Sequence, residues 1–405
     1  MKFIGSQFYP CHSLKRSRRS FLLGLGALSA GIITSGCSSS EEITLKVSLL
    51  ENSIPPQFLR EFRQQLTESV NLKFQAETQI KSLFSLLENW QQQGQSKTEN
   101  ENWQQWFNRK QITISDLVTL GDYWLESAVS QQLIQPLDVE KLQAWKNLPS
   151  PWQNLVRRDQ KGKLSQEGKI WGAPYRWGTT AIAYRRDKFK VLGWKPTDWS
   201  DLWREELRHR ISILDQPREV IGLTLKKLGE SYNEENLDQV PNLKQELIEL
   251  NQQVKFYSSN FYLQPLVLGD TWLAVGWSSD IVSIQKRYQN IGAIVPVSGT
   301  AMWSDLWVQP AVSTTEDNQI QPVVDRWIDF CWSRKSAREI SLLTDAASPI
   351  ITDGEANKLD SETQEQSLLS VPSSIIERSE FLEPLPTKTL TQYQKLWEEM
   401  RQELV

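Results

Sequence analysis

The 405-residue chain contains little cysteine or histidine. Of its three cysteines, Cys11 and Cys37 lie in the N-terminal segment, so Cys331 stands alone in the body of the chain and we expect no internal disulfide. The apolar spacing around Cys331 predicts a buried helical thiol. The two histidines are His12 and His209, and we expect neither a metal site nor a cofactor, because zinc and Ser-His-Asp chemistry would have almost no ligands.

Long apolar runs are also missing, since no stretch after residue 40 approaches the ~20 apolar residues of a membrane-spanning helix. Apolar residues make up 39% of the chain and charged residues 23%, which is typical of a soluble globular protein with room for two α/β domains. The chain also lacks a Gly-x-x-x-x-Gly-Lys phosphate-binding loop. It therefore does not supply energy from ATP itself.

Residues 1–36 are typical of an export signal. They hold five basic residues, no acidic residue and an apolar core over 21–33. The segment Ser17-Arg18-Arg19-Ser20-Phe21-Leu22 resembles the twin-arginine signal of bacteria, which directs folded proteins across the inner membrane. The sequence therefore predicts an extracytoplasmic, periplasmic protein.

Residues 34–37, Thr-Ser-Gly-Cys, resemble a lipoprotein cleavage site, although Thr34 stands where a leucine is usual. Acylation of Cys37 would tether the protein to the inner membrane through residues 37–42, and plain cleavage or an uncleaved anchor are the alternatives. Without residues 1–36 the chain has 40 basic and 49 acidic residues, a net charge of −9. An acidic surface does not suit nucleic acid or an anionic membrane and suits a cationic small molecule, but such surfaces also serve solubility.

The first elements alternate between strand and helix. Period-two apolar patterns predict strands over residues 43–49 and 70–74, and apolar stripes predict helices over 56–66 and 80–87. This β-α-β-α order indicates a mostly parallel sheet covered by helices. Residues 91–110 are rich in Gln, Asn and Glu, which predicts a loop or a loosely docked helix.

Residues 171–189 suggest a crossing between two lobes. Gly172, Pro174 and Gly178 favour turns, and a buried strand is expected over 181–184. An ordinary surface loop within one domain is the alternative. Residues 298–305 suggest a second crossing, with turns that lead into a strand over 306–309. The other expected elements are helices over 199–207, 217–229, 242–254, 323–332 and 390–403, and strands over 211–214, 271–276 and 292–297.

Four segments carry a resemblance to a known family. In chain order they are WGAPYRWGTTAIAYRRDKF, ILDQPREVIGLTLKKLG, LAVGWSSD and GTAMWSDLWVQP. They resemble the periplasmic spermidine/putrescine-binding proteins of ABC-type polyamine importers, most strongly over residues 171–310. The resemblance implies an α/β fold of the two-lobed periplasmic-binding-protein type (type II-like), with two hinge crossings. It implies a first lobe of residues 43–175 and 306–405 and a second lobe of residues 176–305.

The resemblance also implies the ligand-binding residues Asp305, Trp303, Trp277, Glu219 and Tyr123. A polyamine carries ammonium groups on a methylene chain, so its site needs carboxylates for the charges and aromatic walls for the chain. A desolvated cation over an indole contributes ~2 kcal/mol, and a charge-assisted hydrogen bond to a carboxylate ~1.5 to 3 kcal/mol. Other roles are open: Asp305 could cap a turn or pair with an arginine, and Glu219 could complement a helix dipole.

The sequence departs from the family at three places. Gln216 stands where the family has an acidic residue, with Asp215 beside it. Residues 50–53 lack the family's aromatic-acid-aromatic cluster, and Ala346 or Ala347 stands where a tyrosine is expected. These changes leave a smaller, differently charged or non-amine ligand open. Four carboxylates could compensate: Asp215, Asp122, Asp280 and Glu51.

The sequence thus predicts the substrate-binding component of an ABC-type importer rather than an enzyme. We expect it to bind polyamine or another small cationic solute in a cleft, to act as a monomer, and to deliver the solute to permease and ATPase subunits on other chains. One alternative is a secreted carbohydrate-active hydrolase, since tryptophan-lined clefts with paired carboxylates also serve sugars. The others are a solute-binding fold for a non-amine ligand, and a solute-binding fold kept as a scaffold or sensor partner without transport.

Overall fold

The computed structural model describes residues 43–99, 113–312, 319–351 and 368–402. The predicted export signal, the acylation of Cys37 and most of the 91–110 segment lie outside these ranges. Within them, no helix has both the length and the apolar character to cross a membrane.

The N-terminal part forms a parallel sheet covered by helices, as predicted. Strands β1 (Ile43–Leu50), β2 (Val70–Glu77) and β3 (Leu117–Gly121) pair in the order β2-β1-β3. Helix α1 (Phe58–Gln65) buries Phe58 and Phe62, and the Phe62 ring packs edge-on against Trp327 at 5.0 Å. Helix α2 (Ile80–Glu99) continues beyond its predicted end at residue 87.

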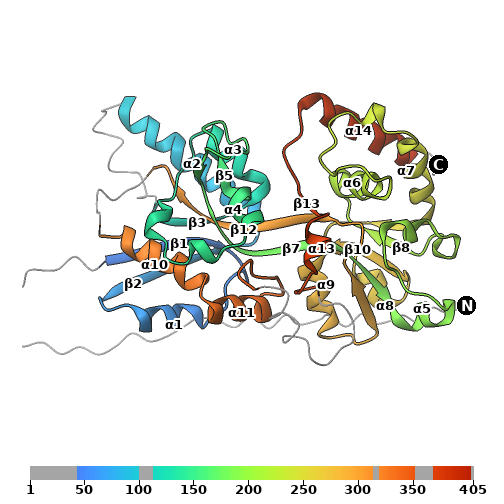
Figure 1. Ribbon diagram of the computed structural model, residues 1–405, viewed down its shortest axis with the longest axis horizontal. Helices are drawn as coiled ribbons and strands as arrows, with labels where there is room; N and C mark the ends of the chain where they lie inside the picture. Colours follow the sequence, from blue (N-terminus) through green and yellow to red (C-terminus); the bar gives the residue numbers. More distant parts are fainter. Residues whose placement is uncertain (1–42, 100–112, 313–318, 352–367, 403–405) are drawn as a thin grey trace, which may run out of the picture. The chain divides into compact units, whose positions relative to one another are not determined.

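Two long strands run through the middle of the sheet (Figure 1). Strand β7 (Ala173–Arg185) pairs through its first half with β12 (Ala301–Pro310), and through its second half with β10 (Leu273–Trp277) and β11 (Ile291–Ile294). The predicted turns at 172–178 and 298–305 are therefore largely wrong. Pairing on both edges keeps β7 extended. Of the three glycines Gly172, Gly178 and Gly299 in these two segments, only Gly299 has a positive φ, of 94°.

The sheet continues beyond β10 with strands β8 (Ile211–Ile213) and β9 (Val254–Tyr257). Helices α6 (Pro217–Lys227) and α7 (Leu243–Gln253) confirm two predictions. Residues 199–207 form two 3-10 segments (Trp199–Trp203 and Glu205–Leu207) instead of the predicted helix, and Asp198 and Asp201 form a capping box at the start of the first.

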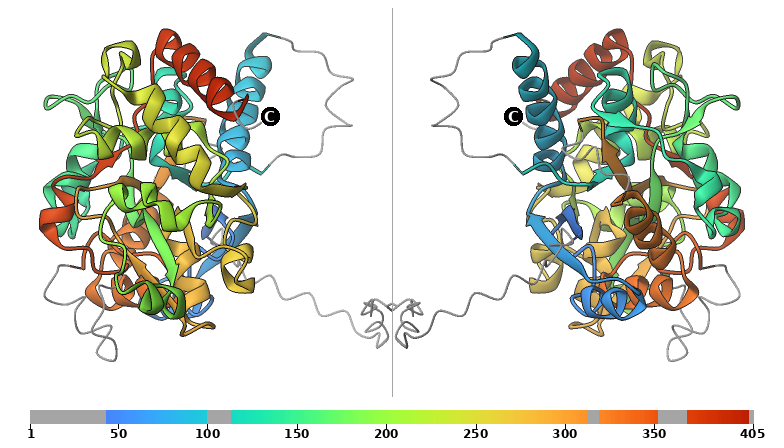
Figure 2. Two further views of the ribbon diagram at one scale, coloured as in Figure 1. Left: turned by 90° about the vertical axis from the view of Figure 1, so that its right-hand side faces the viewer. Right: turned by 90° about the vertical axis from the view of Figure 1, so that its left-hand side faces the viewer.

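The C-terminal helix α14 (Thr387–Gln402) packs against α6 and α7 (Figure 2). Asn251 of α7 donates a hydrogen bond to the carbonyl of Met400 in α14. The predicted lobe boundaries stay a prediction, and this packing favours grouping 387–402 with residues 176–305. Cys331 is fully buried at the end of α10 (Gln321–Cys331), as predicted. The remaining elements are α3 (Leu125–Ser130), β4 (Ile134–Gln135), α4 (Ser150–Val156), β5 (Arg157–Arg158), β6 (Lys169–Ile170), α5 (Arg186–Leu192), α8 (Gln264–Leu268), α9 (Ser278–Gln285), α10 (Gln321–Cys331), α11 (Arg334–Leu343), α13 (Ser373–Ile376) and β13 (Glu380–Phe381).

Candidate ligand-binding site

Several of the predicted site residues meet where the central strands pair. In β12, Asp305 lies opposite Arg176 of β7, and Trp303 lies opposite Gly178. A Cβ at Gly178 would come within 2.4 Å of the Trp303 ring, so only glycine allows the indole to lie this close to β7. The register of two strands thus sets the positions of both predicted residues.

Arg176 and Asp305 form a buried ion pair. The Arg176 Nε lies 2.6 Å from Oδ2 of Asp305, and the two side chains are 9% and 7% exposed. The guanidinium carbon also lies 5.6 Å from the Trp303 ring centroid. Burial acts to lower the pKa of Arg176, but the neighbouring charges, Asp305 foremost, outweigh it and hold the pKa above its ordinary value. The alternative in which Asp305 pairs with an arginine is therefore what the structure contains.

Glu219 lies in the first turn of α6, directly after Pro217 and Arg218. Its carboxylate is buried and accepts a hydrogen bond of 2.8 Å from the Thr180 hydroxyl, and the Trp277 side chain also hydrogen-bonds to it. Burial raises the pKa of Glu219, and these hydrogen bonds counter the rise only in part. The position suits the helix dipole as well, so this carboxylate has both a structural and a binding explanation.

Trp277 connects Glu219 to a second carboxylate. The backbone N–H of Trp277 donates to the Tyr262 hydroxyl oxygen at 3.1 Å, and that hydroxyl donates to Oδ2 of Asp280 at 2.8 Å. The Tyr262 ring fits here because residue 276 is glycine, where a Cβ would lie 1.8 Å from the ring. We call Glu219, Tyr262, Trp277 and Asp280 the carboxylate–indole cluster.

The electrostatic field of Arg176 reaches this cluster. Burial raises the pKa of Asp280, while the Tyr262 hydroxyl and the positive charge of Arg176 act in the opposite direction. Asp345 adds a further negative charge near both Arg176 and Asp280. Strand β7 connects the two groups directly, since it carries both Arg176 and Thr180, whose hydroxyl donates to Glu219.

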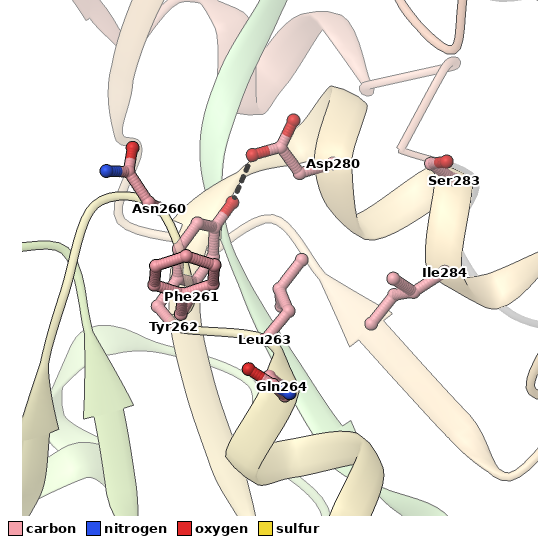
Figure 3. Close-up of a pocket in the computed structure, with 8 residues that line it drawn as sticks. All are labelled: Asn260, Phe261, Tyr262, Leu263, Gln264, Asp280, Ser283 and Ile284. Carbon is pink, nitrogen blue, oxygen red and sulfur yellow. Dashed lines mark hydrogen bonds between the residues drawn. The ribbon is translucent and has the colours of Figure 1, made fainter. Parts of the chain in front are cut away.

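A pocket of about 480 Å³ opens beside the cluster (Figure 3). Tyr262 and Asp280 belong to both the cluster and the pocket wall. Phe261, Leu263 and Ile284 supply apolar surface. The other lining residues are Asn260, Gln264 and Ser283. The pocket thus offers an anionic group within an apolar wall.

Asp122 directly follows β3. In the strand order β3-β12-β7-β10, the ion pair lies between β12 and β7, so Asp122 lies on the opposite side of it from Asp280, which follows β10. Its Oδ1 accepts a hydrogen bond of 2.9 Å from the backbone N–H of Ser304. Burial, followed by the charge of Asp305, raises the pKa of Asp122 to about 7, against the opposing effects of Ser304 and Arg158. Asp122 therefore carries a proton for part of the time at neutral pH.

Three predicted residues do not join these contacts. Asp215 pairs with Arg401 of α14 at 3.0 Å. Tyr123 is 42% exposed, and its ring stands edge-on to Trp124. Glu51 is exposed after the end of β1.

Sequence reasoning missed Arg176, Thr180 and Tyr262. The sequence does contain an indication for Arg176, which is the one charged residue among residues 173–184. Part of this run is predicted as a buried strand, and a buried charge requires a partner. For Thr180 the sequence gives no indication beyond its place in the same run. Tyr262 lies in a loop outside the four segments that resemble the family. Its ring occupies the space beside Gly276, a contact that appears only in the structure.

Comparison with known proteins decides the family. The profile of the family described as "Bacterial extracellular solute-binding protein" matches residues 112–374. The chain belongs to this family. This membership and the structural likeness below confirm the resemblance and the predicted two-lobed α/β binding-protein fold.

Two curated relatives of this solute-binding protein and one solved structure illustrate the likeness. The chain is 30% identical over 222 residues to the putrescine-binding periplasmic protein of Escherichia coli (strain K12), covering 51% of this chain and 58% of that protein. It is 25% identical over 322 residues to the spermidine/putrescine-binding periplasmic protein of Salmonella typhimurium, covering 79% and 81%. The spermidine/putrescine ABC transporter substrate-binding protein of Streptococcus pneumoniae superposes with a TM-score of 0.73 at 19% identity, covering 89% and 99%. The match to the first relative thus spans less than two thirds of that relative's length.

Proposed function

We propose that this chain is the extracytoplasmic substrate-binding component of an ABC-type importer and that it binds a small cationic solute, with polyamines as the first candidates. The observation that carries the proposal is the carboxylate–indole cluster, in which Glu219 and Asp280 flank Trp277 beside an open pocket. The named relatives are polyamine-binding proteins, which supports the same ligand class.

The cluster has the groups that an organic ammonium ion requires. A carboxylate contributes ~1.5 to 3 kcal/mol through a charge-assisted hydrogen bond, and an indole face contributes ~2 kcal/mol when the cation is desolvated. The apolar wall of Phe261, Leu263 and Ile284 would cover the methylene groups of the ligand. Together these contacts favour an amine over a neutral sugar.

We further propose the role of the chain within a transport system. The chain acts as a monomer in the periplasm, is held at the inner membrane through acylated Cys37, and passes its solute to permease and ATPase subunits on other chains. Closure of the lobes follows from the higher affinity of the ligand for the closed state. The relatives are binding proteins, and we infer that this chain likewise has no catalytic activity of its own.

A ligand panel tests the proposal. Thermal shift and calorimetry are measured with putrescine, spermidine, spermine, lysine, arginine and neutral sugars. An amine at ~100 times its Kd should add ~2.7 kcal/mol to the free energy of unfolding, and neutral sugars should add nothing. If every amine leaves the melting temperature unchanged, the cationic ligand class is wrong.

A separate assay addresses the hydrolase alternative. The protein is incubated with a panel of chromogenic glycosides, and release of the chromophore is followed. A hydrolase would turn these substrates over and would lose its rate on substitution of Glu219 or Asp305. A binding component gives no turnover with any glycoside.

A further inference from the structure

The Arg176–Asp305 pair has the chemistry of an occupied cation site. A carboxylate at 2.6 Å and an indole centroid at 5.6 Å surround the guanidinium of Arg176, and these are the two kinds of group that would hold a ligand ammonium. The cation in this position comes from the chain itself. Asp305 and Trp303, which the sequence predicts as ligand contacts, therefore already have a partner.

This occupant is held firmly. Arg176 and Asp305 face one another across paired strands, and both side chains are buried. Over the described ranges, Asp305 is the only hydrogen-bond acceptor of the Arg176 guanidinium. A ligand that displaced Arg176 from Asp305 would leave a buried guanidinium without its partner, which is unfavourable.

The position also places a positive charge beside the cluster. Arg176 and Thr180 lie four residues apart in strand β7, and the Thr180 hydroxyl donates a hydrogen bond to Glu219 of the cluster. Asp280, on the pocket wall, also interacts electrostatically with Arg176. For an amine bound at the cluster, a second ammonium group directed toward Asp305 would therefore face the Arg176 guanidinium rather than a free carboxylate. Repulsive elements of this kind are a common means by which a binding site rejects related ligands.

We propose that Arg176 is a specificity-determining residue that fills a second cation subsite, so that the site gains nothing from additional ammonium groups on a ligand. The inference rests on the proposed function, since it concerns amines bound at the carboxylate–indole cluster. Its substrate class is an organic cation with one ammonium group in the site. A longer polyamine gains no affinity from its next ammonium, because that group would face the Arg176 guanidinium.

The test compares butylamine, which has one amine, with spermidine, which has three. Their Kd values are measured by calorimetry on the chain without residues 1–36, as wild type, R176M, R176K and the double variant R176M/D305N. We expect wild type and R176K to bind spermidine no tighter than butylamine. We expect R176M to shift the ratio of the two Kd values at least tenfold in favour of spermidine, and the double variant to lose most of that shift.

The outcomes separate the two claims. Amine binding with the same spermidine-to-butylamine ratio in wild type and R176M overturns the assignment of Arg176 and leaves the proposed function standing. A wild type that already prefers spermidine tenfold or more also overturns it. No amine binding by any of the four proteins overturns the proposed function itself. If R176M does not fold, R176Q, which keeps a hydrogen-bond donor for Asp305 without the charge, takes its place and should show the same shift in ratio.

Discussion

The Nε of Arg176 donates a hydrogen bond of 2.6 Å to Oδ2 of Asp305 where β7 pairs with β12. Because both groups are buried, removal of one partner leaves an uncompensated charge in the interior. The contact therefore links the stability of the central sheet to the charge pattern of the candidate site.

Stability of the unliganded protein should reveal this link. We expect R176M to lower the free energy of unfolding by about 3 kcal/mol, because Asp305 loses its partner. The double variant R176M/D305N should recover most of the loss, since no charge then remains unpaired. Urea denaturation of wild type, both single variants and the double variant measures the coupling. Additive losses in the double variant would contradict the pairing.

Asp122 should make stability depend on pH. Its pKa is about 7 when folded and near 3.8 when unfolded, so the folded protein binds more protons between pH 4 and 7. The free energy of unfolding should therefore fall as the pH rises through this window, by roughly 1 kcal/mol per pH unit from this group. Denaturation of D122N should show a shallower fall than wild type. Equal slopes for D122N and wild type would refute the assignment.

Glu219 should contribute to amine affinity through its charge. We expect E219Q to raise the Kd for butylamine roughly 10- to 100-fold, which corresponds to the loss of ~1.5 to 3 kcal/mol from a charged hydrogen bond. Calorimetry at constant ionic strength measures the change. The matched control is D215N, because Asp215 pairs with Arg401 outside the cluster. Equal affinity in E219Q and D215N would show that Glu219 only supports the fold.

Trp277 should form the aromatic wall for the cation. We expect W277L to weaken butylamine binding by about 1 to 2 kcal/mol, since leucine keeps apolar bulk without the electron-rich ring face. Trp272 is the control, because it lies against Lys188 and Arg210 instead of the cluster. Calorimetry on W277L and W272L should separate the two sites. Comparable losses in both variants would argue against a specific role for Trp277.

The fold was largely accessible from the sequence. Alternating apolar residues over 43–49 predict β1, and Pro217 marks the start of α6, because periodicity and helix-capping are local properties. The extent of β7 was not accessible. Gly172, Pro174 and Gly178 indicate turns locally, while strand pairing on both edges keeps most of that segment extended.

The candidate site was predictable only in part. Glu219, Trp277 and Asp280 are linked by hydrogen bonds, as members of one site should be, but the sequence does not show that Asp305 already has a partner in Arg176. That fact depends on the register of β7 against β12, which is a long-range property. The contact of Tyr262 with Asp280 likewise depends on a loop whose path local patterns do not specify.

The most direct measurement is a crystal structure of the protein bound to an amine. The account predicts the ligand nitrogen within hydrogen-bond distance of Asp280 or Glu219 and beside the Trp277 indole, with Arg176 still paired to Asp305. A ligand nitrogen on Asp305 with the Arg176 side chain displaced, or an amine bound away from the carboxylate–indole cluster, would contradict it.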